Sequence, residues 1–337
     1  MSIRRGATLV EVLVIVALVG VLVGILLPTL QAAREAVRRT SCGNNVRQLG
    51  LALAAYETAR GRYPVGAESR EWAARRRFPH QFFRWSTLAH LTPYYEEHRL
   101  LADLDLSVPL FVGFGSAAVT PENQAVVART VPLFLCPSDR GGPVSPLFGP
   151  TNYAFSSGSG AGGGTPFDAD GMFFINSAIR PRHVLDGLSK TVALSESTLG
   201  DGPVASADPS AADAATAYAF IFYTPLSEAR CGNAGNWNFT DLRGFSWANG
   251  EYRTTLYNHH RSPNDTTIDC IAALMTTTDI SRLYAGYGWR AARSRHPGGV
   301  TIGLADGAVR FVSDSVDPEL WQAAATRAGG EAAAMLE

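Results

Sequence analysis

The sequence predicts an α+β protein in which one long N-terminal helix packs on a large domain rich in antiparallel β-structure. Three observations predict this class. Residues 12–27 form an apolar run without a charged side chain, and apolar residues recur at helical spacing beyond it. From about Val131 onward, short β-prone segments alternate with clusters of turn-forming residues. The 33 glycines, 19 prolines and 18% charged residues suit a loop-rich β domain better than a helical bundle.

The apolar run is long enough to be a membrane anchor. As a helix, residues 7–27 would extend roughly 32 Å, about the hydrocarbon thickness of a bilayer. A secretory signal has a shorter apolar region followed by a small-x-small cleavage site, and no such site follows here. The segment is therefore expected to remain in membrane lipid. Its one acid, Glu11, costs on the order of a few kcal/mol at mid-bilayer, so it needs a partner or lies at headgroup depth.

The start of the chain, RRGATLVEVLVIVALVGVLVGILLP, resembles the cleavage and methylation segment of type IV prepilins. The resemblance implies a leader of residues 1–6 that ends at Gly6, a mature N-terminus at Ala7, and Glu11 as the fifth mature residue. Pro28 matches a proline that typically kinks the pilin helix. Ala7 stands where the family usually has Phe, which is expected to slow methylation without preventing cleavage. The implied partners are a prepilin peptidase/methyltransferase and other pilin-like subunits, with Glu11 pairing to a neighbour's freed amine.

Flanking charge argues against the orientation that this leader implies. More arginines follow the anchor than precede it, and cytoplasmic flanks usually carry the excess of positive charge. The arginines after the anchor are Arg34, Arg38, Arg39 and Arg47, against Arg4 and Arg5 before it. The leader is read from the cytoplasmic side, so we expect a single-pass inner-membrane protein with a cytoplasmic N-terminus. The main domain is then periplasmic or on the cell surface.

The predicted helix covers residues 7–59 and changes character along its length. Beyond Pro28, which bends a helix because it lacks a backbone donor, apolar side chains fall on one face. This amphipathic half is expected to pack on the sheet of the following domain. Gly61 and Pro64 end the helix, so residues 60–337 form the extracytoplasmic β-rich domain.

The four cysteines are far apart in the sequence and none lies in a CxxC pair, which argues against a zinc site. In an exported domain they permit two disulfides with three possible connectivities, and four buried thiols are the alternative. We expect the pairs Cys231–Cys270 and Cys42–Cys136. The second pair would join the long helix to the segment FLCPSD.

The C-terminal part predicts a β-hairpin followed by a closing helix. Alternating apolar residues flank Asp306-Gly307, a turn dipeptide, and His296 lies before the first of the two strands. Asp317-Pro318 then caps a helix that extends to about residue 327. Together with FLCPSD, DGLSKTVALSES and the prepilin start, this H-x9-DG ending resembles a large pilin-like family of unknown function. Its domain has sometimes been labelled solute-binding, so the resemblance implies architecture more than activity.

No enzymatic, metal or cofactor site is expected. His296 and Asp306 have suitable ligand atoms, but two groups do not make a site, and nothing in the sequence brings His259 or His260 to them. A histidine that stabilises the hairpin and an aspartate in its turn is the favoured interpretation. GxSxG and HExxH motifs are absent, the glycine-rich run 158–164 lacks a phosphate-loop pattern, and Asp168 to Gly171 lacks most ligands of a calcium loop.

Two segments suggest other ligands less strongly. Residues 70–85 mix arginines with aromatics, but a formal net charge of −1 gives no general attraction to nucleic acid, so no nucleic-acid partner is expected. Residues 231–265 combine aromatic and Asn residues that suit a carbohydrate ligand, although aromatics buried in a core are favoured. The leading interpretation is a pilin-like or pseudopilin structural subunit of a type II secretion or type IV pilus-like assembly. The alternative is a membrane-tethered solute- or carbohydrate-binding protein.

Overall fold

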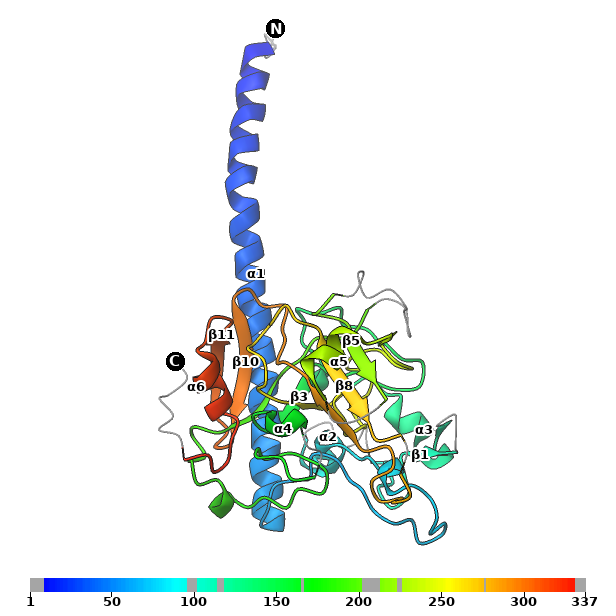
Figure 1. The fold of residues 1–337 in the computed structure, drawn as a ribbon. Helices are drawn as coiled ribbons and strands as arrows, with labels where there is room; N and C mark the ends of the chain where they lie inside the picture. The colour runs from blue at the N-terminus through cyan, green and yellow to red at the C-terminus, as the bar shows by residue number, and fades with distance from the viewer. Residues whose placement is uncertain are drawn as a thin grey trace.

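One long helix projects from a domain that the rest of the chain forms (Figure 1). The computed structural model describes residues 9–95, 102–113, 118–164, 167–201, 213–222, 226–275 and 277–330. Helix α1 (Leu9–Arg60) stands clear of the domain over its first half and lies against it over its second half. The leader and the predicted cleavage site, Gly6 and Ala7, lie outside the described residues.

Helix α1 contains 52 residues and continues through Pro28 without interruption. It ends one residue later than expected, and the next residue, Gly61, adopts φ +68°. The Gly61 amide donates to the carbonyl of Glu57 at 2.7 Å. A glycine in the left-handed region is a common helix terminator, because it lacks the Cβ that makes this conformation unfavourable for other residues.

The two halves of α1 differ in burial as the sequence predicts. In the apolar half, residues 9–30, the large apolar residues are exposed, between 78% at Leu9 and 46% at Val23. An 18-residue window of α1 has a mean hydropathy of 3.0 with none of it buried, so this helix is long and apolar enough to span a membrane. In the packed half, residues 31–60, Val46, Leu49 and Leu53 are buried at helical spacing.

A five-stranded sheet receives the packed half of α1. Its strand order is β11-β10-β4-β3-β7, and α1 packs on β10, β11 and β4. Neighbouring strands are antiparallel except for the parallel pair β3–β7. The strands are β3 (Tyr153–Ser156), β4 (Val192–Glu196), β7 (Leu256–Tyr257), β10 (Gly299–Leu304) and β11 (Val309–Ser313).

A four-stranded sheet of order β6-β5-β8-β9 forms the other half of the domain, and its central pair β5–β8 is parallel. The α+β class with antiparallel-rich sheets is therefore confirmed, and the two parallel pairs are an addition. The remaining strands are β1 (Phe111–Val112), β2 (Ala118–Val119), β5 (Tyr218–Ile221), β6 (Asn236–Trp237), β8 (Asp269–Ala273) and β9 (Gly286–Trp289). The short helices are α2 (Thr87–His90), α3 (Pro121–Val127), α4 (Ala161–Gly164), α5 (Glu228–Gly232) and α6 (Pro318–Ala323). Single 3₁₀ turns span His80–Phe82, Thr92–Tyr94, Pro132–Phe134 and Pro181–His183.

Strands β10 and β11 form the C-terminal hairpin, with Asp306 and Gly307 in its turn. Gly307 has φ +86°, and the Asp306 carboxylate accepts a hydrogen bond from the Ala308 amide at 2.9 Å. Helix α6 follows, and the Asp317 carboxylate at its N-cap accepts from the amides of the next turn. Helix α6 ends at Ala323, four residues before the predicted end near residue 327.

The aromatic side chains of residues 231–265 belong to the core. Trp237, Phe245, Trp247, Tyr252 and Tyr257 are all buried. They therefore form no exposed platform on which a sugar ring could stack, and the core interpretation of this stretch holds.

Candidate functional site: the junction of helix and domain

His296 lies at the point where α1 enters the domain, in the loop before β10. Its side chain is fully buried between two carboxylates from distant parts of the chain. Its Nδ1 is 2.5 Å from Glu35 Oε1, and its Nε2 is 3.0 Å from Glu196 Oε1. The histidine therefore connects α1 to the five-stranded sheet. We call Glu35, Cys42, Cys136, Glu196 and His296 the junction cluster.

Glu35 is the contribution of the packed half of α1 to the polar part of this cluster. Besides His296, it contacts Arg38 one helical turn later, at 2.8 Å. Ser138, in the segment FLCPSD, donates a hydrogen bond to Glu35 at 3.0 Å. One carboxylate on the helix thus meets the hairpin and a loop of the domain at the same place.

Glu196 is the last residue of β4 and is only 2% exposed. Its Oε2 accepts a hydrogen bond from the Thr301 amide of β10 at 2.6 Å, while Oε1 faces His296. The segment DGLSKTVALSES forms β4 with every strand residue buried, which carries the carboxylate into the interior. Its two oxygen atoms are therefore held in fixed positions.

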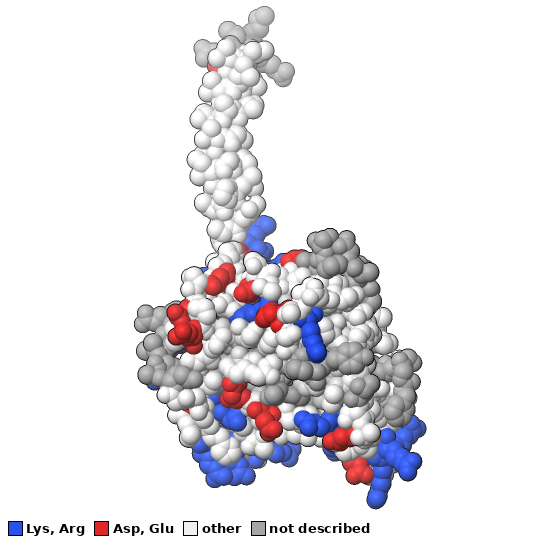
Figure 2. Space-filling view, in the orientation of Figure 1, with Lys and Arg blue, Asp and Glu red and all other residues white. Residues whose placement is uncertain are grey.

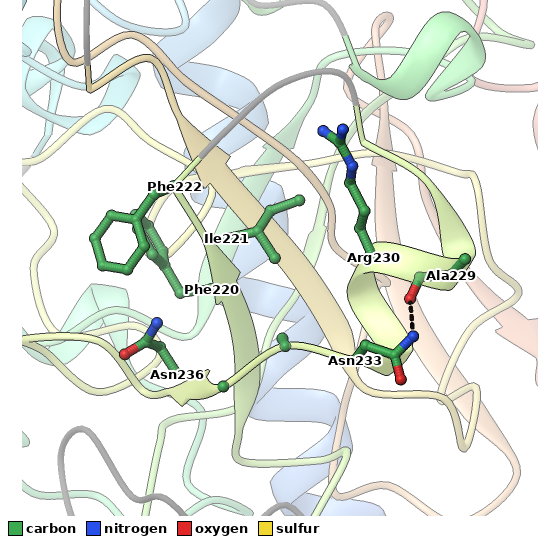
Figure 3. Close-up of a pocket in the computed structure, with 9 residues that line it drawn as sticks. Phe220, Ile221, Phe222, Ala229, Arg230, Asn233 and Asn236 are labelled. Atoms are coloured by element: carbon green, nitrogen blue, oxygen red, sulfur yellow. Dashed lines mark hydrogen bonds between the residues drawn. The ribbon is translucent and has the colours of Figure 1, made fainter.

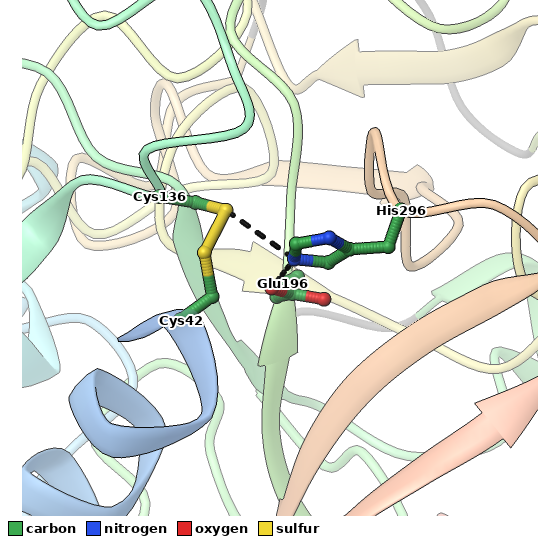
Figure 4. Close-up of side chains that lie close together, drawn as sticks. All are labelled: Cys42, Cys136, Glu196 and His296. Atoms are coloured by element: carbon green, nitrogen blue, oxygen red, sulfur yellow. Dashed lines mark hydrogen bonds and ion pairs between the residues drawn. A yellow bond between two sulfur atoms is a disulfide. The ribbon is translucent and has the colours of Figure 1, made fainter. Parts of the chain in front are cut away.

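The disulfide Cys42–Cys136 completes the cluster, with a Cα–Cα distance of 5.1 Å. Cys42 is on α1, and Cys136 belongs to FLCPSD, so the bond joins the helix to the domain as expected. The His296 ring points toward it (Figure 4), with Nε2 at 3.5 Å from Cys136 Sγ. The second expected pair, Cys231–Cys270, is also joined and links α5 to β8, with a Cα–Cα distance of 5.7 Å.

The junction cluster favours charge on both sides of the helix–domain contact. Burial lowers the pKa of His296, but the hydrogen bonds and charges of Glu196 and Glu35 outweigh it, so the net shift is upward. Burial raises the pKa of Glu35, but hydrogen bonds from His296, Arg38 and Ser138 outweigh it, so that pKa is lowered. An imidazolium between two carboxylates is the arrangement that these shifts describe.

Asp306 and Gly307 lie at the opposite end of β10 and do not meet His296. Instead, the turn approaches α1: a Cβ added to Gly50 would lie 3.3 Å from Gly307 Cα. Glu35 and Gly50 are about 23 Å apart along the helix, at 1.5 Å per residue. The two ends of the H-x9-DG segment therefore contact α1 at two separate levels, which makes the segment a docking element for the helix.

His259 and His260 do not join the junction cluster either. His259 Nδ1 lies 2.6 Å from the Trp321 carbonyl oxygen, and the two rings stack with centroids 3.6 Å apart. His260 stacks on Trp289 and forms an ion pair with Glu228. The candidate calcium loop is likewise occupied by structural contacts, because Asp170 accepts hydrogen bonds from the amide and hydroxyl of Ser159.

The arginines of residues 70–85 are partly engaged with aromatic rings. Arg70 lies over Phe83 at 4.1 Å and Arg75 over Trp72 at 5.2 Å. Arg84 forms a mostly buried ion pair with Glu251 at 3.0 Å. These contacts fit a structural role for the segment.

Sequence reasoning did not assign Glu35 or Glu196 to a site. Glu196 lies within the quoted segment DGLSKTVALSES, where an acid at the end of an otherwise uncharged strand was the available signal. Glu35 lies in an Arg-rich stretch, and nothing in that stretch separates it from an ordinary solvated acid. Glu11, by contrast, lies in the first turn of α1, in the exposed apolar half.

A cavity of about 580 Å³ lies between β5 and α5 (Figure 3). Phe220, Ile221 and Phe222 of β5 and the turn after it form one wall, and α5 with the segment leading to β6 forms the other. Asn233, Asn236 and Arg230 add polar groups to this largely apolar lining. Its size lies in the range usual for small-molecule sites.

A family model described as "Protein of unknown function (DUF1559)", with the label SBP_bac_10, matches residues 31–319. The match includes all five residues of the junction cluster and begins just after the apolar half of α1. No curated protein matches the chain. No solved structure matches it either.

Proposed function

Because the chain belongs to the DUF1559 family, whose function is unknown, we propose a function from its own geometry: it is a pilin-like structural subunit of the pseudopilin kind. The subunit is anchored in the membrane by the apolar half of α1. It acts in a type II secretion or type IV pilus-like assembly, together with other pilin-like subunits.

The observation that carries this proposal is the continuity of α1. A tether for a receptor needs only an anchor and a linker, and a flexible linker serves that purpose. Here the apolar half continues without a break into a half that is fixed to the domain by a disulfide and an ion pair. A continuous helix of this kind can pack its apolar half against the corresponding helices of neighbouring subunits. Its packed half then holds each domain at a fixed position relative to that contact.

Glu11 fits the same function. In the apolar half of α1, a carboxylate is unfavourable unless it is paired. The prepilin resemblance provides a partner, the freed amine of Ala7 on an adjacent subunit. Two groups that are costly to bury alone become tolerable together, and their pairing sets the register of otherwise uniform apolar helices.

The proposed orientation has a cytoplasmic leader, an inner-membrane anchor and the domain on the outer side. Figure 2 shows an apolar shaft almost without charge, with cationic side chains where it meets the domain. Two of the arginines there are engaged by the protein itself: Arg38 pairs with Glu35, and Arg39 lies 4.8 Å over the Phe311 ring. The arginines after the anchor still oppose this orientation by the positive-inside rule, and the proposed orientation is supported by the prepilin-like leader instead.

Substitution of Glu11 tests the assembly function. Glu11→Gln removes the charge, and Glu11→Val also removes the polarity, so both variants should insert into membranes at least as well as the wild type. Both should lose self-association, measured by co-purification of tagged and untagged chains from membranes. Leu18→Val, two helical turns away on the same face, is the matched control and should associate normally. Equal self-association of Glu11→Val and wild type would contradict the assembly role and leave a tethered receptor.

The second candidate is a membrane-tethered solute-binding protein, which the cavity between β5 and α5 favours. Its lining suits a small, largely apolar solute with a few hydrogen-bonding groups. Ala234→Trp should fill the cavity and abolish binding of such a solute, measured by calorimetry on the detergent-solubilised chain. If Ala234→Trp binds the solute as the wild type does, this candidate is wrong.

A further inference from the structure

We propose that the junction cluster is also a redox-controlled zinc site: when the Cys42–Cys136 disulfide is reduced, Cys42, Cys136, Glu196 and His296 bind one zinc ion. The site is independent of the filament function. The sequence did not predict this site, because its four residues lie in four separate segments, and no metal was expected.

The donor atoms suit zinc. Cysteine thiolates, imidazole nitrogen and carboxylate oxygen are the ligands that zinc takes in proteins, usually four in a tetrahedron. One donor atom from each of the four side chains lies within 4.8 Å of all the others. All four residues are buried, between 0% and 4% exposed, so the donors are shielded from solvent.

The distances are close to those of a tetrahedral zinc site. With zinc–sulfur and zinc–nitrogen bonds of about 2.3 and 2.0 Å, tetrahedral geometry separates sulfur from nitrogen by about 3.5 Å and nitrogen from oxygen by about 3.3 Å. The corresponding distances are 3.5 Å from Cys136 Sγ to His296 Nε2 and 3.0 Å from Nε2 to Glu196 Oε1. The two sulfurs must separate from their covalent bond to about 3.8 Å. Figure 4 shows the imidazole of His296 directed at the disulfide, with the Glu196 carboxylate beside the ring.

The groups behind the donors are those that orient zinc ligands elsewhere. A zinc-bound histidine usually donates its other N–H to a carboxylate, which fixes the ring and its tautomer. His296 Nδ1 faces Glu35 at 2.5 Å, which leaves Nε2 for the metal. The second oxygen of Glu196 is held by the Thr301 amide. Four protein donors leave no open position, so the chemistry is that of a structural zinc rather than a catalytic one.

Conversion of the disulfide state into the zinc-bound state can be written as two balanced steps. A dithiol reductant becomes a disulfide and transfers two electrons, and Cys42 and Cys136 become two thiols. Zinc then displaces the two thiol protons, together with the extra proton of the His296 imidazolium. Both states join α1 to the domain at the same place, one by a covalent bond and the other by a metal. A chain that meets zinc before it is oxidised would therefore keep the junction closed.

The second cysteine pair is an internal control. Cys231 and Cys270 belong to no group of three or more potential ligands among the residues that the structure describes. Reduction frees all four sulfurs, but among the described residues only Cys42 and Cys136 have a histidine and a carboxylate beside them. Zinc should therefore select Cys42 and Cys136.

The test uses the full chain purified from membranes in detergent and reduced with a phosphine, which leaves as its oxide. Cobalt(II), a spectroscopic substitute for zinc, should bind in a 1:1 ratio and give a thiolate-to-cobalt charge-transfer band with the strong visible bands of a tetrahedral ion. Zinc should displace it and protect Cys42 and Cys136, but not Cys231 and Cys270, from alkylation mapped by mass spectrometry. The oxidised chain should bind no stoichiometric cobalt.

Variants separate the site from general folding. Cys42→Ser and His296→Gln should lose the 1:1 complex, whereas the double variant Cys231→Ser/Cys270→Ser should retain it. Glu35→Gln keeps all four donors and should weaken zinc affinity by about 10- to 100-fold, the usual effect of losing such a support. The site is disproved if the reduced wild-type chain gives no thiolate–cobalt band, folded or not. It is equally disproved if Cys42→Ser retains the full spectrum.

Discussion

At the residue scale, two buried histidines show how surroundings decide charge. His296 lies between Glu35 and Glu196, and these carboxylates favour its protonated form. His259 contacts only neutral groups: its Nδ1 donates to the Trp321 carbonyl, so its Nε2 must accept from the Tyr257 hydroxyl at 3.1 Å. Burial lowers the pKa of His259 to about 3, with the Trp321 carbonyl opposing the shift. The surroundings therefore favour the charged form of His296 at the junction and the neutral form of His259 between β7 and α6.

His259 predicts acid sensitivity. Its folded pKa lies below the unfolded value of 6.5, so its contribution to stability is full above about pH 6.5 and is lost as the pH falls toward about 3. At pH 4.5 the unfolding free energy has fallen by about 2 to 3 kcal/mol through this histidine. His259→Gln should flatten the fall of the unfolding free energy between pH 7 and 4.5, measured by urea titration in detergent. Identical slopes for the wild type and His259→Gln would contradict the assignment.

At the element scale, the hairpin β10–β11 positions α1. Its strands provide the surface under the packed half of the helix, and its two ends contact the helix at Glu35 and Gly50. The turn is fixed by its own hydrogen bond from the Gly307 amide to Leu304 at 2.9 Å. The helix must therefore adapt to the turn, and a glycine on the helix allows the close approach.

Two glycines of α1 are expected to respond differently when each is replaced by alanine. Alanine in a helix is favoured over glycine by about 1 kcal/mol. At Gly43 the added Cβ meets side-chain atoms only at 3.9 Å or more, so Gly43→Ala should raise the unfolding free energy by about that amount. At Gly50 the Cβ lies 3.3 Å from Gly307 Cα, so Gly50→Ala should give no gain or a loss. Urea titration of both variants measures the difference, and an equal gain at both positions would show that the turn yields.

At the scale of the whole molecule, one helix serves two environments. Its apolar half is exposed and suits lipid, and its packed half is buried by the sheet. Two disulfides strengthen the domain on either side: one fixes α1 and the other fixes the second sheet to α5. The helix and the domain are therefore joined by covalent and ionic contacts at the place where the helix leaves its apolar half.

Processing at the N-terminus is the whole-molecule prediction. The prepilin resemblance places cleavage after Gly6, where a side chain would obstruct the approach of the peptidase to the backbone. Gly6→Val should therefore leave the precursor uncleaved, detected by intact mass and N-terminal peptide mapping of the membrane fraction. Gly20→Val, the same change in the apolar half with nothing within 4 Å, should still be processed to start at Ala7. Mature protein starting at Ala7 in Gly6→Val would refute the prepilin assignment.

Signals within short stretches of sequence determined much of the architecture. The apolar run predicts a helix suited to membrane lipid, because an uninterrupted series of apolar side chains favours lipid whatever the rest of the chain does. The alternation around Asp306-Gly307 predicts the hairpin, and Asp317-Pro318 predicts the start of α6, since turns and caps depend on neighbours in the chain. The even number of cysteines predicts disulfides without fixing their connectivity.

Only the tertiary structure decided which residues meet. The parallel pairs β3–β7 and β5–β8, the cavity beside α5 and the junction cluster all depend on contacts between distant segments. Glu35 and His296 are 261 positions apart, and no periodicity links them. Sequence patterns report burial and local conformation, whereas a site is formed by the directions in which buried side chains point once the strands are in register. The sequence therefore predicts only that His296 stabilises the hairpin, whereas the fold places it among four potential ligand side chains.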